Sequence, residues 1–214
     1  VTVLMSDVRG YSAIAERTDP TALAGQLDRH RAAMNDAILE AGGTVMQYVG
    51  DAVMAVFGAP FPQEDHANAA VEAALGMHER QSVLDEQWAA EGRSPFGLGI
   101  GLSTGEVAAA MLGSEQRYEY TLVGDTVNMA QRLQDLARPA GTTVLSDATV
   151  EALGGRWSTE EMGVQKVKGR DTPVRCHRLL GSAPAVGVSG HVAHHVSAAG
   201  DTDRSTSERW ERDR

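Results

Sequence analysis

The sequence has little cysteine: Cys176 is the single one among 214 residues. One thiol excludes an internal disulfide and is typical of a protein from a reducing compartment, so we expect a cytoplasmic location. The sequence also lacks any apolar run near the roughly 20 residues that a membrane helix needs. It has no N-terminal stretch resembling a signal peptide. We therefore expect no membrane contact by this segment.

Basic residues are scarce, since 19 Lys and Arg residues stand against 29 Asp and Glu residues and give a formal net charge of -10. A protein of this charge gains little from attraction to a phosphate backbone, so we expect no nucleic-acid partner. If such a protein binds a polyanionic ligand, it needs local positive charge. Divalent cations are the obvious source of that charge.

The two ends of the sequence differ from its middle. The first residue is Val1 and it already belongs to a strand-like run, so we expect a piece of a longer, multidomain or membrane-anchored protein. From residue 181 onward, small residues and dense mixed charge replace the apolar periodicity, which predicts a disordered tail. His191, His194 and His195 lie in this tail, where solvated side chains are a better interpretation than a metal site. The predicted domain is therefore 1–180, with a tail over 181–214.

The order of the expected elements indicates an α+β fold. A strand over 1–5, a helix from Pro20, a hairpin, a long helix and a strand over 96–102 follow one another, with hairpin strands at 44–49 and 52–57. This is the βαββαβ order of a ferredoxin-like core. The rest predicts a C-terminal αβ extension, with strands at 106–112, 118–123, 142–145, 163–168 and 173–180 and helices at about 125–137 and 147–153.

This strand order has a consequence for two acidic residues. Asp7 is expected just past the first strand, and Asp51 just before the third. In the ferredoxin-like order the third strand lies antiparallel between the first two, so both carboxylates should meet at one edge of the sheet. Paired carboxylates suit hard cations, which prefer oxygen ligands. Taken alone, however, Asp7 is better interpreted as a loop cap and Asp51 as a hairpin-turn residue.

Four sequence blocks change that balance. They are VLMSDVRGYS at 3–12, GTVMQYVGDAVMAVFGAP at 43–60, YTLVGDTVNMAQRL at 120–133 and VKG at 167–169. In this order and spacing they resemble the metal, nucleotide and triphosphate motifs of class III adenylate and guanylate cyclases. The resemblance covers about 1–180 and implies the nucleotide cyclase fold. It also implies an in-line attack of a ribose 3′-oxygen on the α-phosphorus, which releases pyrophosphate.

The resemblance implies a metal and phosphate site in the first block. Asp7, Asp51 and the carbonyl of Val8 match the ligands of two divalent cations, Mg²⁺ or Mn²⁺, in each active site. One cation would lower the pKa of the 3′-hydroxyl and the other would neutralise the triphosphate. Backbone amides of the following segment match those that wrap the β- and γ-phosphates; the segment consists of Arg9, Gly10, Tyr11 and Ser12.

Three further positions match residues that contact the substrate. Asn128 matches the residue that orients the ribose, Arg132 the arginine that stabilises charge on the α-phosphate, and Lys168 the lysine on the terminal phosphates. Asn128 and Arg132 are four apart and share one helix face, while Ala130, Leu133 and Ala137 occupy the other. Without the motif, a solvated polar face would be the simpler interpretation.

Two positions that read the base in this family are Gln47 and Thr121 here. Threonine fits the adenine pattern, whereas Gln47 is neither the lysine of adenylate cyclases nor the glutamate of guanylate cyclases. A glutamine amide both donates and accepts, so it could serve either base. ATP is the expected substrate, and GTP or mixed use stays open.

In the family, the aspartates come from one domain and the Asn–Arg helix and lysine from another. Both sets are present here, which implies a homodimer with two shared sites. An alternative of another class is an inactive cyclase-like module that binds nucleotide or only dimerises. Such copies usually lack a metal aspartate or the arginine, and this sequence retains Asp7, Asp51, Asn128, Arg132 and Lys168.

Overall fold

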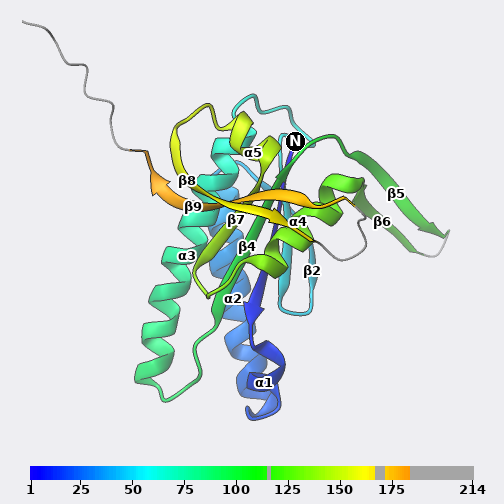
Figure 1. The fold of residues 1–214 in the computed structure, drawn as a ribbon. Coiled ribbons are helices and arrows are strands. Elements are labelled where there is room, and N and C mark those ends of the chain that lie inside the picture. Colours follow the sequence, from blue (N-terminus) through cyan, green and yellow to red (C-terminus); the bar gives the residue numbers. More distant parts are fainter. Residues whose placement is uncertain (115–116, 167–171, 184–214) are drawn as a thin grey trace, which may run out of the picture. The chain divides into compact units, whose positions relative to one another are not determined.

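The computed structural model describes residues 1–114, 117–166 and 172–183 (Figure 1). Lys168 and the tail beyond residue 183 lie outside these ranges, so their predicted roles stay predictions. Strand β9 (Val174–Ser182) extends two residues into the predicted tail. No helix in the described part is long and apolar enough to cross a membrane.

A large mixed sheet forms the centre of the described part. Its members are β1 (Thr2–Arg9), β2 (Thr44–Val49), β3 (Ala52–Phe57), β4 (Gly97–Thr104), β7 (Thr142–Ser146), β8 (Trp157–Gln165) and β9. They are arranged in the order β2-β3-β1-β4-β7-β9-β8. Strand β3 lies between β1 and β2 and runs antiparallel to both, as the ferredoxin-like order predicts. The α+β fold class is confirmed, and β7, β8 and β9 are the predicted C-terminal extension.

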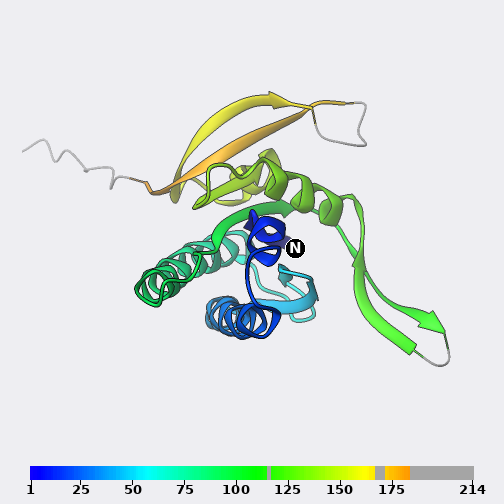
Figure 2. The same ribbon diagram turned by 90° about the horizontal axis from the view of Figure 1, so that it is seen from below.

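Helices α2 (Pro20–Glu40) and α3 (His66–Ala90) cover one face of β1 to β4, and α4 (Asp125–Leu136) packs on the other (Figure 2). Alternate residues of β1 enter two separate cores, because successive side chains of a strand point to opposite faces. Leu4 packs with residues of α2 and α3, whereas Val3 and Met5 pack with Ala130 of α4. The sheet therefore has a face for the long helices and a face for α4.

The ends of the long helices follow from local sequence. The Asp19 carboxylate accepts hydrogen bonds from the amides of Thr21 and Ala22, both at 3.0 Å, and Pro20 occupies the first helical position. This N-cap satisfies donors that a helix start leaves free. Buried His30 bonds to Gln81 on α3, at 2.6 Å. It is a packed residue, as its position on an apolar stripe predicts.

Strands β5 (Ala108–Ser114) and β6 (Arg117–Val123) form a separate two-stranded hairpin. Figure 2 shows this hairpin projecting beyond the sheet and its helices. Met111, Leu112 and Val123 are exposed on it. An exposed apolar arm of this kind is typical of a surface that another chain covers.

Three boundaries differ from the sequence prediction. Strand β1 continues to Arg9, so Asp7 lies inside the strand and not past its end. Residues expected as a loop after it begin a short helix, α1 (Tyr11–Ala15). Strand β8 begins at Trp157, earlier than the predicted 163, because pairing with β9 supports its exposed first half. Pairing across a sheet extended both strands beyond their local apolar pattern.

Candidate active site

The two predicted metal-binding aspartates meet at one edge of the sheet. Asp7 lies near the end of β1, and Asp51 occupies the turn between β2 and β3, next to the pairing of Ser6 with Val53. The Asp7 and Asp51 carboxylates lie close enough together for Asp51 to raise the pKa of Asp7. The amide of Val8 also donates to Oδ2 of Asp51 at 3.0 Å. The strand order thus brings together two carboxylates that are distant in the sequence.

The turn that carries Asp51 is held from helix α2. Val49 pairs with Ala52, so only Gly50 and Asp51 form the turn, and Gly50 adopts a φ of 60° that favours glycine. The Arg31 guanidinium donates to the Gly50 carbonyl and lies 5.0 Å from the ring centroid of Tyr48. This clamp fixes the turn, and with it the direction of the Asp51 carboxylate.

The electrostatics of the pair favour a bound cation. The pKa of Asp7 is raised from 3.8 to about 7, chiefly by burial and further by the adjacent Asp51 side chain and its charge. The nearby Arg9 charge and Gln134 amide oppose that rise in pKa. Two adjacent carboxylates repel each other unless one is protonated or a cation lies between them. The pair therefore fits a hard divalent cation, because oxygen ligands and local negative charge are what such an ion requires.

Further ligands for such an ion would have to come from outside the acidic pair. Within the described residues there is no group of three or more His, Cys, Asp or Glu side chains placed to hold a metal. Backbone carbonyls such as that of Val8, phosphate oxygens and water are the ligands that Mg²⁺ uses beside one or two carboxylates. The donor set is therefore that of a site completed by a phosphate-bearing ligand.

Replacing Asp51 with asparagine should stabilise the metal-free protein at pH 8. The pKa of Asp7 is raised in the folded state, so folding stability falls as pH rises from about 4 to about 7 and stays low above that. Asp51→Asn removes the like charge, so its thermal midpoint in EDTA should exceed that of the wild type by a few degrees at pH 8 and differ less at pH 5. Circular dichroism melts measure this difference.

The control for this experiment is Asp36→Asn, which changes an exposed carboxylate of α2. Its thermal midpoint should match the wild type at both pH values. A midpoint for Asp51→Asn at or below the wild-type value at pH 8 would show that repulsion between Asp7 and Asp51 does not strain the fold.

Helix α4 presents the predicted substrate residues on its free side. Asn128 is exposed and Arg132 is partly exposed, while Ala130 and Leu133 are fully buried against the sheet. A Cβ at Gly101 of β4 would overlap the backbone of α4 at Ala130 and Gln134, so glycine lets the helix approach closely. This close packing of α4 on β4 leaves the Asn–Arg face of the helix free.

The predicted phosphate-binding segment, residues 9–12, runs from the end of β1 into α1. Gly10 is exposed with a φ of 74° and starts α1. The Tyr11 ring turns toward Phe96, with ring centroids 6.0 Å apart, and Ser12 is exposed. The Arg9 side chain turns toward α4 and is only 11% exposed, so the segment has its backbone and not this side chain to offer a phosphate.

The two positions predicted to read the base lie on neighbouring elements. Gln47 is half-buried on β2, just after a register irregularity, and Thr121 is half-buried on β6 opposite Ala110. Strands β2 and β6 are in contact. The structure thus brings the elements that carry Gln47 and Thr121 together within one chain.

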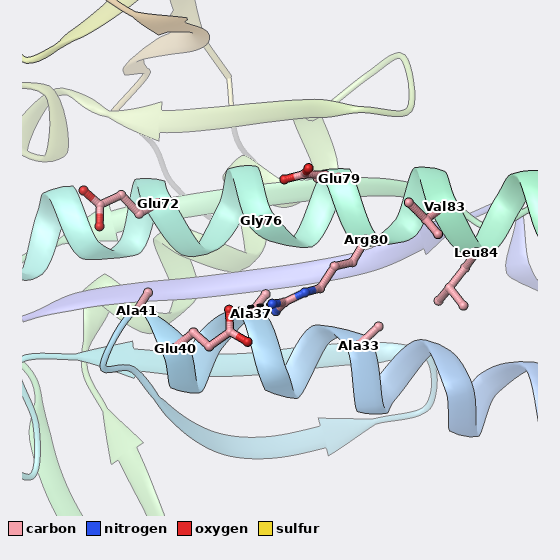
Figure 3. Close-up of a pocket in the computed structure, with 10 residues that line it drawn as sticks. All are labelled: Ala33, Ala37, Glu40, Ala41, Glu72, Gly76, Glu79, Arg80, Val83 and Leu84. Carbon is pink, nitrogen blue, oxygen red and sulfur yellow. Dashed lines mark hydrogen bonds and ion pairs between the residues drawn. The ribbon is translucent and has the colours of Figure 1, made fainter.

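A groove of about 600 Å³ lies elsewhere, between α2 and α3 (Figure 3). Ala33, Ala37 and Val83 contribute to its apolar part, and an ion pair between Glu40 and Arg80 crosses it at 2.5 Å. None of its lining residues is a predicted site residue. The carboxylates and α4 belong to the opposite face of the sheet, where one chain is expected to form only half of each site.

Comparison with known proteins agrees with this arrangement. Residues 1–181 match the family model of the adenylate and guanylate cyclase catalytic domain. This chain is a member of that family. The predicted resemblance is confirmed, and members of the family use divalent metal ions.

Individual relatives include both substrate types. Adenylate cyclase 1 of Rhizobium meliloti is 30% identical over 187 residues, which are 87% of this chain and 28% of that protein. The adenylyl cyclase CyaB from P. aeruginosa superposes with a TM-score of 0.81 at 32% identity and covers 87% of this chain and 96% of its own. The guanylyl cyclase Cya2 superposes with a TM-score of 0.79 at 31% identity, over 87% and 94%.

The chain spans about 28% of that Rhizobium meliloti protein. The family and its fold are therefore established for the catalytic domain. Within the domain, the role of Arg31 has no local sequence signal, because its contact with the Gly50 carbonyl joins residues on two different elements. This contact depends on how α2 is positioned along the hairpin, which tertiary packing decides.

Proposed function

We propose that this cyclase domain converts ATP to 3′,5′-cyclic AMP and pyrophosphate for signal transduction. The observation that carries the proposal is the contact between the Asp7 and Asp51 carboxylates beside the Val8 backbone. Adenylate cyclases at about 30% identity support ATP as the substrate. The reaction forms a bond from the ribose 3′-oxygen to the α-phosphorus and breaks the bond to the β-phosphate oxygen.

The chain's own residues act in this reaction by positioning and by charge. Two divalent cations, Mg²⁺ or Mn²⁺, held by Asp7, Asp51 and the Val8 carbonyl would lower the pKa of the 3′-hydroxyl and neutralise the triphosphate. Asn128 would orient the ribose through its amide. Arg132 would donate several hydrogen bonds to the α-phosphate as charge develops there, because a guanidinium matches phosphate geometry. Such preorganised donors need no rearrangement during the reaction.

The active site is proposed to be shared between two copies of the chain. Asn128 and Arg132 face away from the sheet that carries Asp7, so they are placed to meet a ligand held by another molecule. The exposed apolar residues of the β5–β6 hairpin offer part of the covering surface. A two-fold homodimer would contain two such sites, each with the aspartates of one protomer and the α4 residues of its partner.

Guanylate or mixed cyclase activity is the second candidate, and Gln47 is the observation that favours it. A glutamine amide can accept from the adenine amino group or donate to the guanine carbonyl after flipping. The similarity to the guanylyl cyclase Cya2 is nearly as high as that to CyaB. Weak discrimination would follow, because selectivity needs a group that penalises the wrong base.

A product assay with ATP and GTP side by side, in Mg²⁺ and in Mn²⁺, tests the proposal. We expect cyclic AMP as the main product. Gln47→Glu should shift the ratio of kcat/KM values toward GTP by about tenfold or more, because a carboxylate accepts from the guanine N1–H and N2 amino groups and repels the adenine N1 lone pair. The control Gln87→Glu alters an exposed residue of α3 and should leave the ratio unchanged. Cyclic GMP as the main wild-type product would overturn the choice of ATP.

A further inference from the structure

The Arg9 side chain reaches from the end of β1 to the end of helix α4. Its Nε donates to the carbonyl of Ala137 at 3.1 Å, and its Nη2 donates to the carbonyl of Gln134. Its third contact is longer, with Nη1 4.0 Å from Oδ2 of Asp7. The hydrogen bonds of this guanidinium are therefore made to α4, although Arg9 follows Asp7 closely in the sequence.

Strand β4 leaves room for this side chain. Arg9 pairs with Gly97 and Asp7 pairs with Gly99, so the side-chain positions of these four residues share one face of the sheet. A Cβ at Gly99 would overlap the Arg9 guanidinium. The guanidinium therefore occupies the space that a side chain at Gly99 would need, in a gap built for it.

The contacts suit both ends of the interaction. The last carbonyls of an α-helix lack intrahelical partners and carry partial negative charge, so a buried cation that donates to two of them stabilises the helix end. The start of α4 is held separately, since the Thr126 hydroxyl donates to the Glu106 carbonyl at 2.8 Å. Asn128 and Arg132 lie between these two fixed ends.

We propose that Arg9 is a positioning residue for Asn128 and Arg132. It holds the last turn of α4 against the sheet and so fixes the direction in which the free face of the helix presents its side chains. This inference rests on the proposed shared active site, and it implies that one protomer contributes to both sites. Asp7 of one protomer serves one active site, whereas Arg9 of the same protomer serves the other, through α4.

Hydrogen exchange tests the structural part without reference to activity. Arg9→Met and Gly99→Ala, which displaces the guanidinium, should each speed amide exchange of residues 133–137 by about tenfold or more through local opening of the helix end. Arg17→Met, at an exposed arginine beyond α1, is the control and should leave that exchange unchanged. Unchanged exchange at the end of α4 in folded Arg9→Met overturns the proposal, whether or not the chain is a cyclase.

A heterodimer with one intact site tests the functional part. One protomer carries Asp51→Ala and supplies only α4; the other carries Arg132→Ala and supplies only the carboxylates. Arg9→Lys or Arg9→Met on the first protomer should lower kcat by about tenfold to a hundredfold, as for a misplaced positioning group. On the second protomer the same change should lower kcat by a clearly smaller factor than on the first, because α4 of the second protomer serves no active site, although Arg9 lies 4.0 Å from Asp7 there.

The two experiments separate the possible failures. An inactive parent heterodimer would count against the shared site of the proposed function, and hydrogen exchange would still decide whether Arg9 holds α4. If the parent is active and the Arg9 substitution lowers kcat at least as much on the second protomer as on the first, Arg9 acts on Asp7 and the proposal is overturned.

Arg9→Lys separates charge from hydrogen-bond geometry, since lysine keeps the cation but lacks the fork that reaches two carbonyls.

Discussion

Asp51→Ala should lower cyclase turnover at saturating ATP about a thousandfold or more. Removing one of two carboxylates from a cation site costs several kcal/mol of transition-state stabilisation, and each 1.36 kcal/mol is a factor of ten. The change leaves the hydrophobic cores intact, because Asp51 is a turn residue, although the Val8 amide loses its acceptor. Initial rates in Mg²⁺ and in Mn²⁺, together with a circular dichroism spectrum, measure the two effects.

Two variants make that loss interpretable. Asp51→Asn keeps an oxygen that can accept from the Val8 amide, so its fold should resemble the wild type while its turnover stays low. Asp36→Ala changes an exposed carboxylate of α2 and should leave turnover unaltered. Near-wild-type activity in Asp51→Ala would exclude the metal assignment of this residue. A folded wild-type chain that binds ATP without turnover would instead favour the inactive module.

Mixing Asp51→Ala chains with Arg132→Ala chains should restore activity that neither variant has alone. In the heterodimer, one site combines the intact carboxylates of the second chain with the intact α4 of the first. After complete exchange of equal amounts, half of the dimers are mixed and each has one working site out of two. The expected recovery is therefore about one quarter of wild-type activity.

The recovery should depend on subunit exchange. Activity should rise with incubation time and reach a plateau, and chains tagged differently should co-purify. Adding a third chain that carries both substitutions should dilute the recovered activity, because its dimers contain no intact site. Exchanging, folded chains that remain inactive in the mixture would contradict a site shared between protomers and would place all catalytic residues within one chain.

The meeting of Asp7 and Asp51 was predictable because topology decides it. Once the βαββαβ order was read from the sequence, the third strand had to lie beside the first, and this brought Asp7 and Asp51 together. The position of Asp7 inside β1 was not predictable, because the C-terminal end of this strand is polar and lacks the apolar alternation that indicates a strand. Backbone pairing with β4 extends the strand to Arg9.

The glycines of β4 show what could not be predicted from the sequence. Glycine at alternate positions of a strand indicates that something packs closely on one face, and the contacts at Gly99 and Gly101 are of this kind. What packs there could not be read from the strand, because the Arg9 guanidinium and the α4 backbone come from distant segments. The direction of the Arg9 side chain was missed for the same reason, since motif matching describes a segment and not the contacts of its side chains.

The two-residue turn at Gly50 and Asp51 also limits how this domain can vary in length. One added residue would replace the two-residue turn with a three-residue loop of different backbone geometry. It would also separate the Gly50 carbonyl from Arg31 and turn the carboxylate away from β1. Variation in natural relatives and insertions in engineered versions should therefore avoid this hairpin tip, even though exposed turns elsewhere in proteins commonly accept them.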